Sequence, residues 1–203
     1  MSLTVTDICN MALRHIGART ITAIDADASQ EDRDCNVYYA QCRDTVLRDY
    51  PWPFAAKRDA MTEVTIDSST HEDYYGLYDY AYSFPSDCLK PRQVFEAETY
   101  YDKPFEIMRL EDDTKVILTD AEDAILFYTM AVTDVTWFDT QFVNALALCL
   151  ASKIARPLTK SAQLAERLDM EYRQAIREAE ASANAEHRPV KKPTVPWIDA
   201  RYE

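Results

Sequence analysis

The chain of 203 residues contains only two glycines, Gly17 and Gly76. Phosphate-binding loops, dinucleotide fingerprints and nucleophile elbows need glycine wherever the backbone approaches a ligand closely or adopts a positive φ. None of these motifs can be formed from two isolated glycines. The sequence therefore argues against the enzyme classes that depend on such loops.

Long apolar runs and closely spaced cysteine pairs are also missing. No stretch of about 18 consecutive apolar residues is present, so we expect no membrane-spanning helix. The first residues, MSLTVTDICNMALRHIG, lack the basic start and apolar run of a secretion signal, which predicts a soluble protein made in the cytoplasm. The cysteines never occur as Cys-x-x-Cys, which predicts buried free thiols rather than disulfides or a zinc cluster: Cys9, Cys35, Cys42, Cys88 and Cys149.

Groups suited to acid-base or metal chemistry are few. Of the three histidines, we expect His15 to be partly buried on the first helix, His71 to lie in a charged loop and His187 to lie at a helix end. Acidic clusters fall at a predicted helix start and in predicted turns, at residues 31–34, 111–113 and 120–123. A two-metal nuclease, which needs carboxylates that converge from separate elements, stays the alternative. We predict no catalytic residue, no cofactor-binding residue and no metal ligand, and hence no enzyme.

The overall composition is that of a globular protein with an excess of acid. Hydrophobic residues make up 47% of the chain and charged residues 28%. The formal net charge is −13, from 22 basic and 35 acidic residues. Such a charge opposes binding to nucleic-acid phosphates, and it suits a surface along which DNA slides without sticking.

Two helices are predicted in the first quarter of the chain. Apolar residues recur at helical spacing over residues 4–16, where Thr4 or Thr6 can cap the helix. The second helix is predicted from Ser29 to Tyr50. Its buried face is predicted to comprise Cys35, Tyr39, Cys42, Val46 and Tyr50.

The middle of the chain, residues 54–135, has a different pattern. Short alternating and β-branched runs separated by proline and acidic turns predict a small antiparallel sheet. Many of the 13 tyrosines lie here, especially between residues 74 and 82. Because tyrosine is enriched at interfaces, they are either strand residues covered by their own fold or contact residues for a partner.

Helical spacing returns in the last third of the chain. An apolar stripe wide enough for a helix buried on most sides begins at Asp139, and we expect Pro157 to end that helix. A cap at Thr159 or Ser161 then opens a long last helix. Residues 187–203 contain three prolines and no helical stripe, which predicts an extended arm.

Together these elements predict an α+β fold that is mainly α. Helix pairs from both ends of the chain can bury their stripes against each other, so we expect a four-helix bundle of two N-terminal and two C-terminal helices with a β-rich antiparallel insertion. The predicted domains are a helical bundle domain at 1–53 and 136–186, the insertion at 54–135 and an extended C-terminal arm at 187–203.

The stretch RDYPWPFAAKRDA, residues 48–60, places two prolines around one tryptophan. Pro51 must end the second helix, because proline lacks an N–H donor and disfavours helical geometry in the residue before it. We predict that Pro51, Trp52 and Phe54 form a structural corner that fixes the helix end against the bundle and directs the chain into the sheet. A contact of Trp52 with another subunit is the alternative.

Two segments, ICNMALRHIGARTITAID and SQEDRDCNVYYAQCRDTVLRDYPWPFA, resemble the opening of the tail tubular protein A family. These proteins are head-to-tail adaptors of short-tailed, T7-like bacteriophages and related prophages. The resemblance covers residues 5–58; after residue 60 it rests on layout alone, a β-rich middle followed by NALALCLASKIARPLT and a long helix. The matching positions are Asn10, Ala12, Leu13, Ile16, Gly17, Tyr39, Arg43, Asp44, Leu47, Tyr50, Pro51, Trp52 and Phe54.

The resemblance implies a structural virion protein, a head-to-tail adaptor or connector. Such adaptors assemble as a ring, typically twelvefold, between the portal protein and the tail nozzle or tube, and they line the DNA channel. It implies that DNA passes without specific binding and that neither a membrane nor a cofactor takes part. The protein would reside in the virion after assembly in the bacterial host cytoplasm, and we expect a monomer in dilute solution.

In similar proteins the C-terminal segment reaches the portal. We therefore predict that the arm at 187–203 binds the portal through its apolar residues, Val195, Trp197, Ile198 and Tyr202. The alternatives are another non-enzymatic phage tail-completion protein, or a metal-dependent nuclease or hydrolase that uses the acidic clusters.

Overall fold

The computed structural model describes residues 3–24, 29–65, 76, 78–98, 101–110 and 113–186, with only the backbone for 183–186. Within these residues the chain forms four α-helices, two short 3-10 helices and seven strands. None of the helices in this part of the chain is long and apolar enough to cross a membrane. The predicted arm at 187–203 lies outside the described residues.

Helix α1 (Val5–His15) starts with a reciprocal cap. The backbone N–H of Asp7 donates to the Thr4 hydroxyl at 3.2 Å, and the Asp7 carboxylate accepts from the Thr4 N–H at 2.9 Å. Thr4 therefore caps this helix, and Thr6 does not. His15 is exposed in the last turn, so the prediction that it is partly buried is wrong: it lies at the edge of the apolar face, where a basic side chain in solvent suits the C-terminal end of a helix, and the buried residues of α1 are Ile8, Cys9, Ala12 and Leu13.

Helix α2 (Gln30–Asp49) begins after Ser29, whose hydroxyl accepts from the Asp32 N–H at 3.2 Å. A side-chain oxygen at this position satisfies one of the free N–H groups of the first turn. Burial is confirmed for Cys35, Tyr39, Cys42 and Val46, whereas Tyr50 follows the last helical residue and is only half-buried. The structure adds Asp32 and Leu47 to the buried face. The buried residues of α2 are Asp32, Cys35, Tyr39, Cys42, Val46 and Leu47.

Helix α3 (Thr140–Thr159) begins at its cap Asp139, which accepts from the Phe142 N–H at 2.7 Å. Pro157 lies inside this helix, so the prediction that it ends the helix is wrong. Its missing N–H falls in the last turn, and the helix runs on until Lys160 takes a left-handed conformation with φ of 57°. Helix α4 (Ala162–Glu186) follows, and the Leu164 N–H donates to Ser161 at its start at 3.2 Å.

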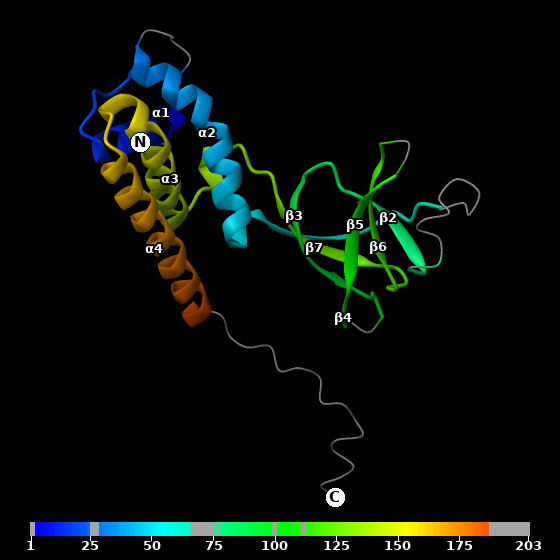
Figure 1. Ribbon diagram of the computed structural model, residues 1–203. Coiled ribbons are helices and arrows are strands. Elements are labelled where there is room, and N and C mark those ends of the chain that lie inside the picture. The colour runs from blue at the N-terminus through cyan, green and yellow to red at the C-terminus, as the bar shows by residue number, and fades with distance from the viewer. Residues whose placement is uncertain are drawn as a thin grey trace, which may run out of the picture.

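The other three helices are arranged around α3, as Figure 1 shows. Helices α1, α2 and α4 each pack extensively on α3, whereas α1 meets α2 only briefly. The prediction of a four-helix bundle is therefore wrong, because in a bundle each helix would pack beside two neighbours around a shared axis. The reason lies in α3, which is apolar on almost all sides and is covered by the other helices. Its buried residues are Phe142, Val143, Ala145, Leu146, Ala147, Leu148, Cys149, Leu150, Ala151, Ile154 and Ala155.

The strands form two antiparallel sheets rather than the single small sheet that was predicted. One sheet has the order β1-β7-β3-β4 and the other the order β2-β6-β5. The fold is thus α+β, with a helical layer on one side and the sheets on the other (Figure 1). The strands are β1 (Ala56–Ala60), β2 (Tyr80–Ser83), β3 (Cys88–Phe95), β4 (Asp102–Lys103), β5 (Phe105–Arg109), β6 (Lys115–Thr119) and β7 (Ile125–Met130).

The two sheets enclose a hydrophobic core that is separate from the core of the helical layer. Tyr82 and Ile117 from the three-stranded sheet pack with Val94, Leu126 and Tyr128 from the four-stranded sheet. Successive residues of a strand point to opposite faces. The neighbours of Ile117 in β6 therefore belong to a separate cluster on the other face of the three-stranded sheet, which contains Ala81, Leu110, Val116 and Leu118.

Candidate functional site

The chain crosses twice between the helical layer and the sheets. It leaves α2 through residues 50–55, which include the 3-10 helix η1 (Pro53–Ala55), and enters β1. It returns from β7 through residues 131–139, which include the 3-10 helix η2 (Val135–Trp137), and enters α3. Both crossings lie in the narrow region between the two parts in Figure 1. We treat this junction as the candidate functional site.

The outgoing crossing is an extended corner. Tyr50 has φ −132° and ψ 144°, and Trp52 has φ −56° and ψ 130°, so α2 stops where proline geometry requires it to stop. Trp52 is only 1% exposed, and its indole Nε1–H donates to the Val46 carbonyl at 2.8 Å. This hydrogen bond folds the tryptophan back onto the last turns of α2, which leaves the indole no exposed face for a partner.

The returning crossing supplies the other half of an aromatic cluster. Phe142 at the start of α3 lies edge-on to the Trp52 ring, with 5.2 Å between centroids, and edge-on to the Phe54 ring at 5.1 Å. Phe138 stands 4.5 Å from Phe142 and 5.8 Å from Phe54. Edge-to-face contacts at these separations are favourable beyond the apolar area that they bury. The two crossings are therefore packed against each other.

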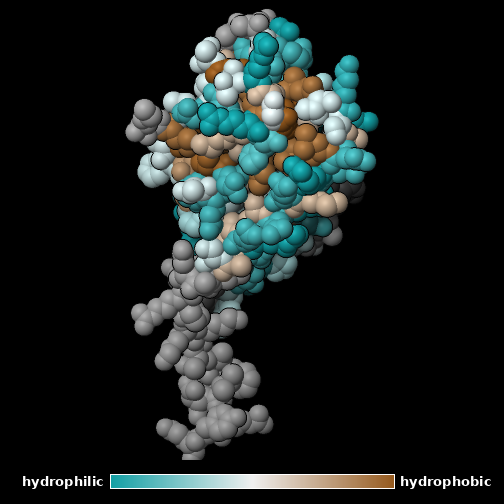
Figure 2. All heavy atoms as spheres, turned by 90° about the vertical axis from the view of Figure 1, so that its left-hand side faces the viewer, coloured by the Kyte–Doolittle hydropathy of each residue, from teal (hydrophilic) through white to brown (hydrophobic). Residues whose placement is uncertain are grey.

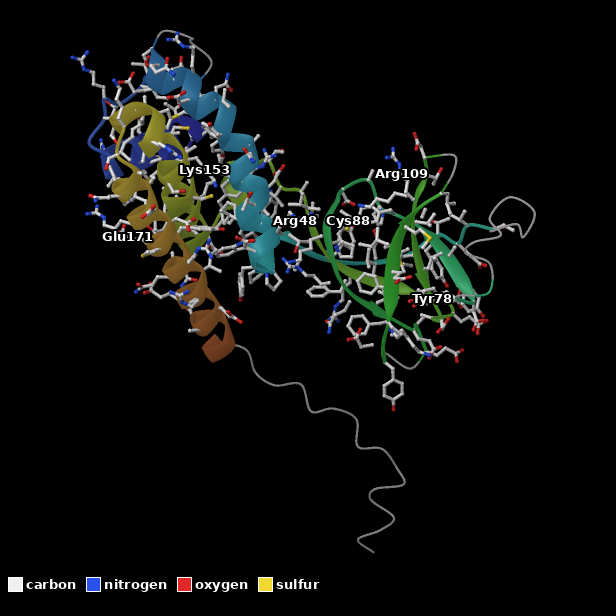
Figure 3. The ribbon with its side chains drawn as sticks, viewed as in Figure 1. Arg48, Tyr78, Cys88, Arg109, Lys153 and Glu171 are labelled. Carbon is white, nitrogen blue, oxygen red and sulfur yellow. The ribbon has the colours of Figure 1, made fainter. Side chains whose placement is uncertain are left out.

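Three basic side chains join the end of α2 to β3. Arg92 donates through Nη2 to the carbonyls of Leu47 at 3.3 Å and Arg48 at 2.8 Å, and through Nε to the Thr129 hydroxyl at 3.0 Å. Lys90 donates to the same Arg48 carbonyl at 3.0 Å. Arg48 donates in the other direction, to the Leu89 carbonyl. In Figure 3, Arg48 at the end of α2 and Cys88 at the start of β3 mark the two sides of this contact. We call Arg48, Lys90 and Arg92 the basic latch.

The basic latch brings like charges together. Partial burial lowers the pKa of Lys90 and of Arg92, and their positive neighbours lower it further, while Asp49 acts in the opposite direction. The carbonyls at the C-terminal end of a helix carry partial negative charge and attract cations. The helix end therefore compensates the repulsion within the latch and receives hydrogen bonds that no residue of α2 itself provides.

A second contact ties α2 to α4. The Tyr172 hydroxyl donates to the Asp49 carboxylate at 2.6 Å, and the Tyr172 ring is buried. Burial, followed by the hydrogen bond to Asp49, raises the pKa of Tyr172 above its ordinary value. The protonated phenol is therefore part of the folded state.

Replacing Tyr172 with phenylalanine should lower the free energy of unfolding at neutral pH by about 1 kcal/mol, the usual contribution of one hydrogen bond. The folded protein holds this proton more tightly than the unfolded chain does. The contribution is therefore complete below about pH 10, where an unfolded tyrosine titrates, and is lost as the pH rises toward the folded pKa. Urea unfolding at a series of alkaline pH values should show a shallower loss of stability in Tyr172→Phe than in the parent. Equal slopes would contradict the assignment.

A third network lies on the sheet side of the junction. The Tyr128 hydroxyl donates to Asp87 at 2.9 Å, and the Lys57 ammonium lies 3.1 Å from the same carboxylate. Partial burial raises the pKa of Asp87, but the hydrogen bonds from Lys57 and Tyr128 outweigh it and hold this pKa below its ordinary value. Lys57 also lies 3.2 Å from Asp59. These contacts hold β1, β7 and the turn before β3 in place.

A shallow pocket of about 290 Å³ lies beside the aromatic cluster. The end of α2, the start of α3 and the last turns of α4 surround it, and its lining residues are Tyr50, Trp52, Pro53, Asp139, Thr140, Gln141, Ala179 and Ser182. The only carboxylate among them, Asp139, already caps α3. The junction thus presents packing and hydrogen bonds rather than a group of side chains aimed at a substrate.

The structure places the predicted site residues unevenly. Pro51, Trp52 and Phe54 come together at the junction. His71 and His187 lie outside the described part of the chain. The four predicted arm residues also lie outside it: Val195, Trp197, Ile198 and Tyr202. The cluster at 31–34 lies at the start of α2, and the cluster at 120–123 lies between β6 and β7. Among the described residues, no three histidine, cysteine or acidic side chains are grouped so that they could hold a metal ion.

The basic latch was not foreseen from the sequence. Its signal is local: Lys90 and Arg92 are two residues apart, which places them on one face of a strand, and Arg48 lies in the last turn of a helix. What the sequence does not contain is the pairing of that strand face with that helix end.

Neither protein-family models nor curated proteins match this chain. The class that the fold and the junction define is an α+β protein in which a helical layer and a pair of sheets are joined by an aromatic cluster and a basic latch.

Proposed function

We propose that this protein is a structural virion protein and not an enzyme: a head-to-tail adaptor that forms a ring between the portal and the tail nozzle or tube of a phage or prophage. The proposal starts from the resemblance of residues 5–58 to the tail tubular protein A family. An adaptor must hold one partner at a fixed position relative to another. It therefore needs two parts that do not move against each other.

The junction is the observation that carries the proposal. The corner of Pro51, Trp52 and Phe54 is the most distinctive piece of the resemblance, and its rings pack on Phe138 and Phe142 from the returning crossing. The basic latch adds hydrogen bonds from β3 to the end of α2. Interdigitated rings and a multiply bonded helix end oppose hinge motion, which favours a rigid connector over a protein that closes around a substrate.

The surface of the helical layer supports assembly into a ring. Neighbours in a ring meet head to tail, so two different faces of the subunit must take part. Val37 on α2 is 69% exposed and Met170 on α4 is 68% exposed, and these helices pack on α3 from different sides (Figure 1). Figure 2 shows apolar side chains gathered in the upper half of the face turned away from the sheets. Trp137 in η2, 66% exposed, adds a residue type that often anchors interfaces.

The acidic character of the chain fits a channel through which DNA moves. A net charge of −13 repels phosphates and gives DNA no binding site along the channel. In the proposed adaptor, residues 187–203 bind the portal, with Val195, Trp197, Ile198 and Tyr202 as apolar anchors. The ring would be twelvefold in keeping with similar proteins, and the isolated chain monomeric at low concentration.

The test is assembly with the portal protein of the same phage or prophage. We expect light scattering and negative-stain imaging at rising protein concentration to show rings of uniform diameter, and the portal to raise the mass further. A chain that ends at residue 186 should fold as the parent does but lose most of its portal binding. Far-UV circular dichroism of both chains provides the folding control.

Two outcomes would overturn the proposal. A protein that stays monomeric and ignores the portal at every concentration is not an adaptor. A protein that binds the end of the tail tube but not the portal is a tail-completion protein instead. Retention of full portal binding after removal of residues 187–203 would leave the adaptor in place and move the contact to another surface.

A further inference from the structure

Strand β5 is an open edge of the three-stranded sheet. The Leu110 N–H donates to the Thr114 carbonyl at 2.8 Å, in the register that pairs β5 with β6. Hydrogen-bonded pairs alternate along an antiparallel ladder, so the N–H and C=O groups of Phe105, Ile107 and Arg109 point away from β6. Among the described residues, no backbone group bonds to them. Ile107, in the middle of this edge, is 45% exposed.

The other edge of the same sheet is covered. The Val64 N–H donates to the Ala81 carbonyl at 2.8 Å, and the Ser83 N–H donates to the Thr62 carbonyl at 2.8 Å. Residues 62–64 therefore occupy the outer side of β2. In the four-stranded sheet, the edge strand β4 has only two residues. Proteins usually cover or shorten their edge strands, and β5, with five residues, is neither covered nor short.

Strand β1 is the open edge of the four-stranded sheet. The Met61 N–H donates to the Ala124 carbonyl at 2.9 Å, in the register that pairs β1 with β7. By the same alternation, the backbone groups of Ala56 and Arg58 point away from β7. The Ala56 N–H bonds back to the Pro53 carbonyl. The Ala56 carbonyl and both backbone groups of Arg58 have no backbone partner among the described residues.

The two open edges lie at opposite sides of the pair of sheets. Strand β4 leads into β5 through Pro104 alone, so these two edge strands are neighbours. Strand β1 leads directly into residues 62–64, which cover β2, so the edges formed by β1 and β2 are neighbours as well. A subunit with one open edge on each side is suited to pair head to tail with copies of itself.

We propose that β5 of one copy pairs antiparallel with β1 of the next copy, so that a shared sheet joins neighbouring subunits of the ring. The proposal rests on the proposed function and names a surface through which the ring closes. Addition of a strand to an open edge supplies main-chain hydrogen bonds, and the side chains select the partner. All strand pairs within the described chain are antiparallel, which is the more stable arrangement per residue.

Charge selects the register between the two copies. Outward backbone groups must face outward backbone groups, and this condition is met when Arg58 faces Phe105. Lys57 then lies opposite Glu106, and opposite charges across a strand pair are favourable. A shift by two residues along β5 would instead place Asp59 opposite Glu106, and a shift by four would place two arginines opposite each other. A shift in the other direction would leave most of β5 unpaired.

This register uses the open backbone groups of both strands. Arg58 and Phe105 exchange two hydrogen bonds, and the Ile107 N–H donates to the Ala56 carbonyl. The three donors and three acceptors concerned are among those that have no backbone partner within the described chain. The Ala56 N–H, which already bonds to Pro53, is not needed.

The faces of the two sheets also match in this pairing. Lys57 lies on the inner face of the four-stranded sheet, with its ammonium 5.7 Å from the centroid of the Tyr128 ring. Phe105 packs in the core between the sheets, so Glu106, the next residue, lies on the outer face of the three-stranded sheet. The inner faces of two stacked sheets look in opposite directions. Joining an inner face to an outer face is therefore what a copy requires that is displaced sideways without being turned over.

The first test is Ile107→Pro in the full chain. Since the Ile107 N–H points away from β6, proline removes a donor to the next copy but no internal hydrogen bond, and an edge strand tolerates it. We expect far-UV circular dichroism and the urea midpoint to stay as in the parent, while ring assembly requires a roughly tenfold higher protein concentration. Asp102→Pro is the matched control, because it removes an outward N–H from the short edge strand β4. It should assemble as the parent does.

Cysteine pairing tests the register without proline. In a Cys88→Ser background, the chain carries Ala56→Cys together with Ile107→Cys, which the register places opposite each other at a separation that a disulfide spans. We expect oxidation of the assembled rings to give a ladder of linked chains on a non-reducing denaturing gel. Each single substitution should give only monomers. Dimers from Ile107→Cys alone would show that β5 pairs with β5 and would overturn the proposal.

The outcomes separate this pairing from the adaptor itself. Rings that Ile107→Pro forms as readily as the parent, or rings in which the two introduced cysteines stay unlinked, would overturn the pairing and leave the adaptor in place. A ladder of linked chains without closed rings would support the pairing and contradict the ring. A parent that forms no rings and no linked chains, with or without the portal, would overturn both.

Discussion

Replacing Trp52 with alanine should lower the free energy of unfolding by about 4 kcal/mol. The indole is 1% exposed, so its removal leaves a cavity between the end of α2 and the start of α3. The Val46 carbonyl also loses its bond to the indole N–H, at 2.8 Å in the parent. Urea unfolding followed by far-UV circular dichroism measures the change.

Two other substitutions make this prediction specific. Trp52→Phe keeps a ring against Phe142 and loses the hydrogen bond and part of the volume, so it should cost about 1 to 2 kcal/mol. Trp137→Ala removes the same kind of side chain from an exposed position, 66% exposed, and should change stability by no more than about 0.5 kcal/mol. A Trp52→Ala protein as stable as Trp137→Ala would show that the corner contributes little to the fold.

The same comparison bears on function. If Trp52 were a partner contact, Trp52→Ala would weaken assembly while leaving the isolated chain stable. If it holds the junction, the isolated chain is destabilised and assembly is lost as a consequence. For Trp137 the expectation is the reverse, since this ring is exposed in η2: Trp137→Ala should fold normally and assemble poorly in the proposed ring.

Rules that act over a few residues were sufficient for the helix starts. Thr4 and Ser29, both predicted as caps, each accept a hydrogen bond from the N–H three residues later. Asp139, where helical spacing was predicted to begin, does the same. The same kind of rule was wrong at Pro157, because a proline in the last turn removes a donor without preventing the turn. Helix ends depend on small balances that residue type alone does not settle.

The sequence did not indicate which helices and strands pack or pair with one another. The apolar stripes predicted buried helices, yet the same stripes suit a bundle or a cluster around α3. Strand β1 pairs with β7, which follows much later in the chain, so short-range patterns could not assign the strands to two sheets. At the junction the corner was visible as Pro-Trp-Pro-Phe, whereas the latch exists only once β3 is placed beside the end of α2.

The second large effect is expected at Arg92, where alanine should lower the free energy of unfolding by about 2 to 3 kcal/mol. Its guanidinium bonds to the carbonyls of Leu47 and Arg48 and to the Thr129 hydroxyl, and Thr129 is buried. Truncation leaves these three acceptors without that donor. Because they belong to α2 and β7, we expect the helical layer and the sheets to lose their fixed orientation as well.

Arg92→Lys and Arg109→Ala are the matched comparisons for this prediction. Lysine keeps the charge near the helix end but cannot reach three acceptors with a planar fork, so Arg92→Lys should fall between the parent and Arg92→Ala. Arg109, whose side chain is 70% exposed and pairs only with Asp113 among the ion pairs of the described residues, should change stability by no more than about 0.5 kcal/mol on replacement by alanine.

Small-angle X-ray scattering separates a loosened junction from a general loss of stability. In conditions where Arg92→Ala is still folded, its radius of gyration should exceed that of the parent, since the two parts then sample several orientations. Arg109→Ala and Tyr172→Phe should scatter as the parent does. If Arg92→Ala is less stable but scatters identically, the aromatic cluster alone sets the orientation, and the basic latch contributes stability without rigidity. A rigid adaptor would then depend on Trp52, Phe54, Phe138 and Phe142 alone.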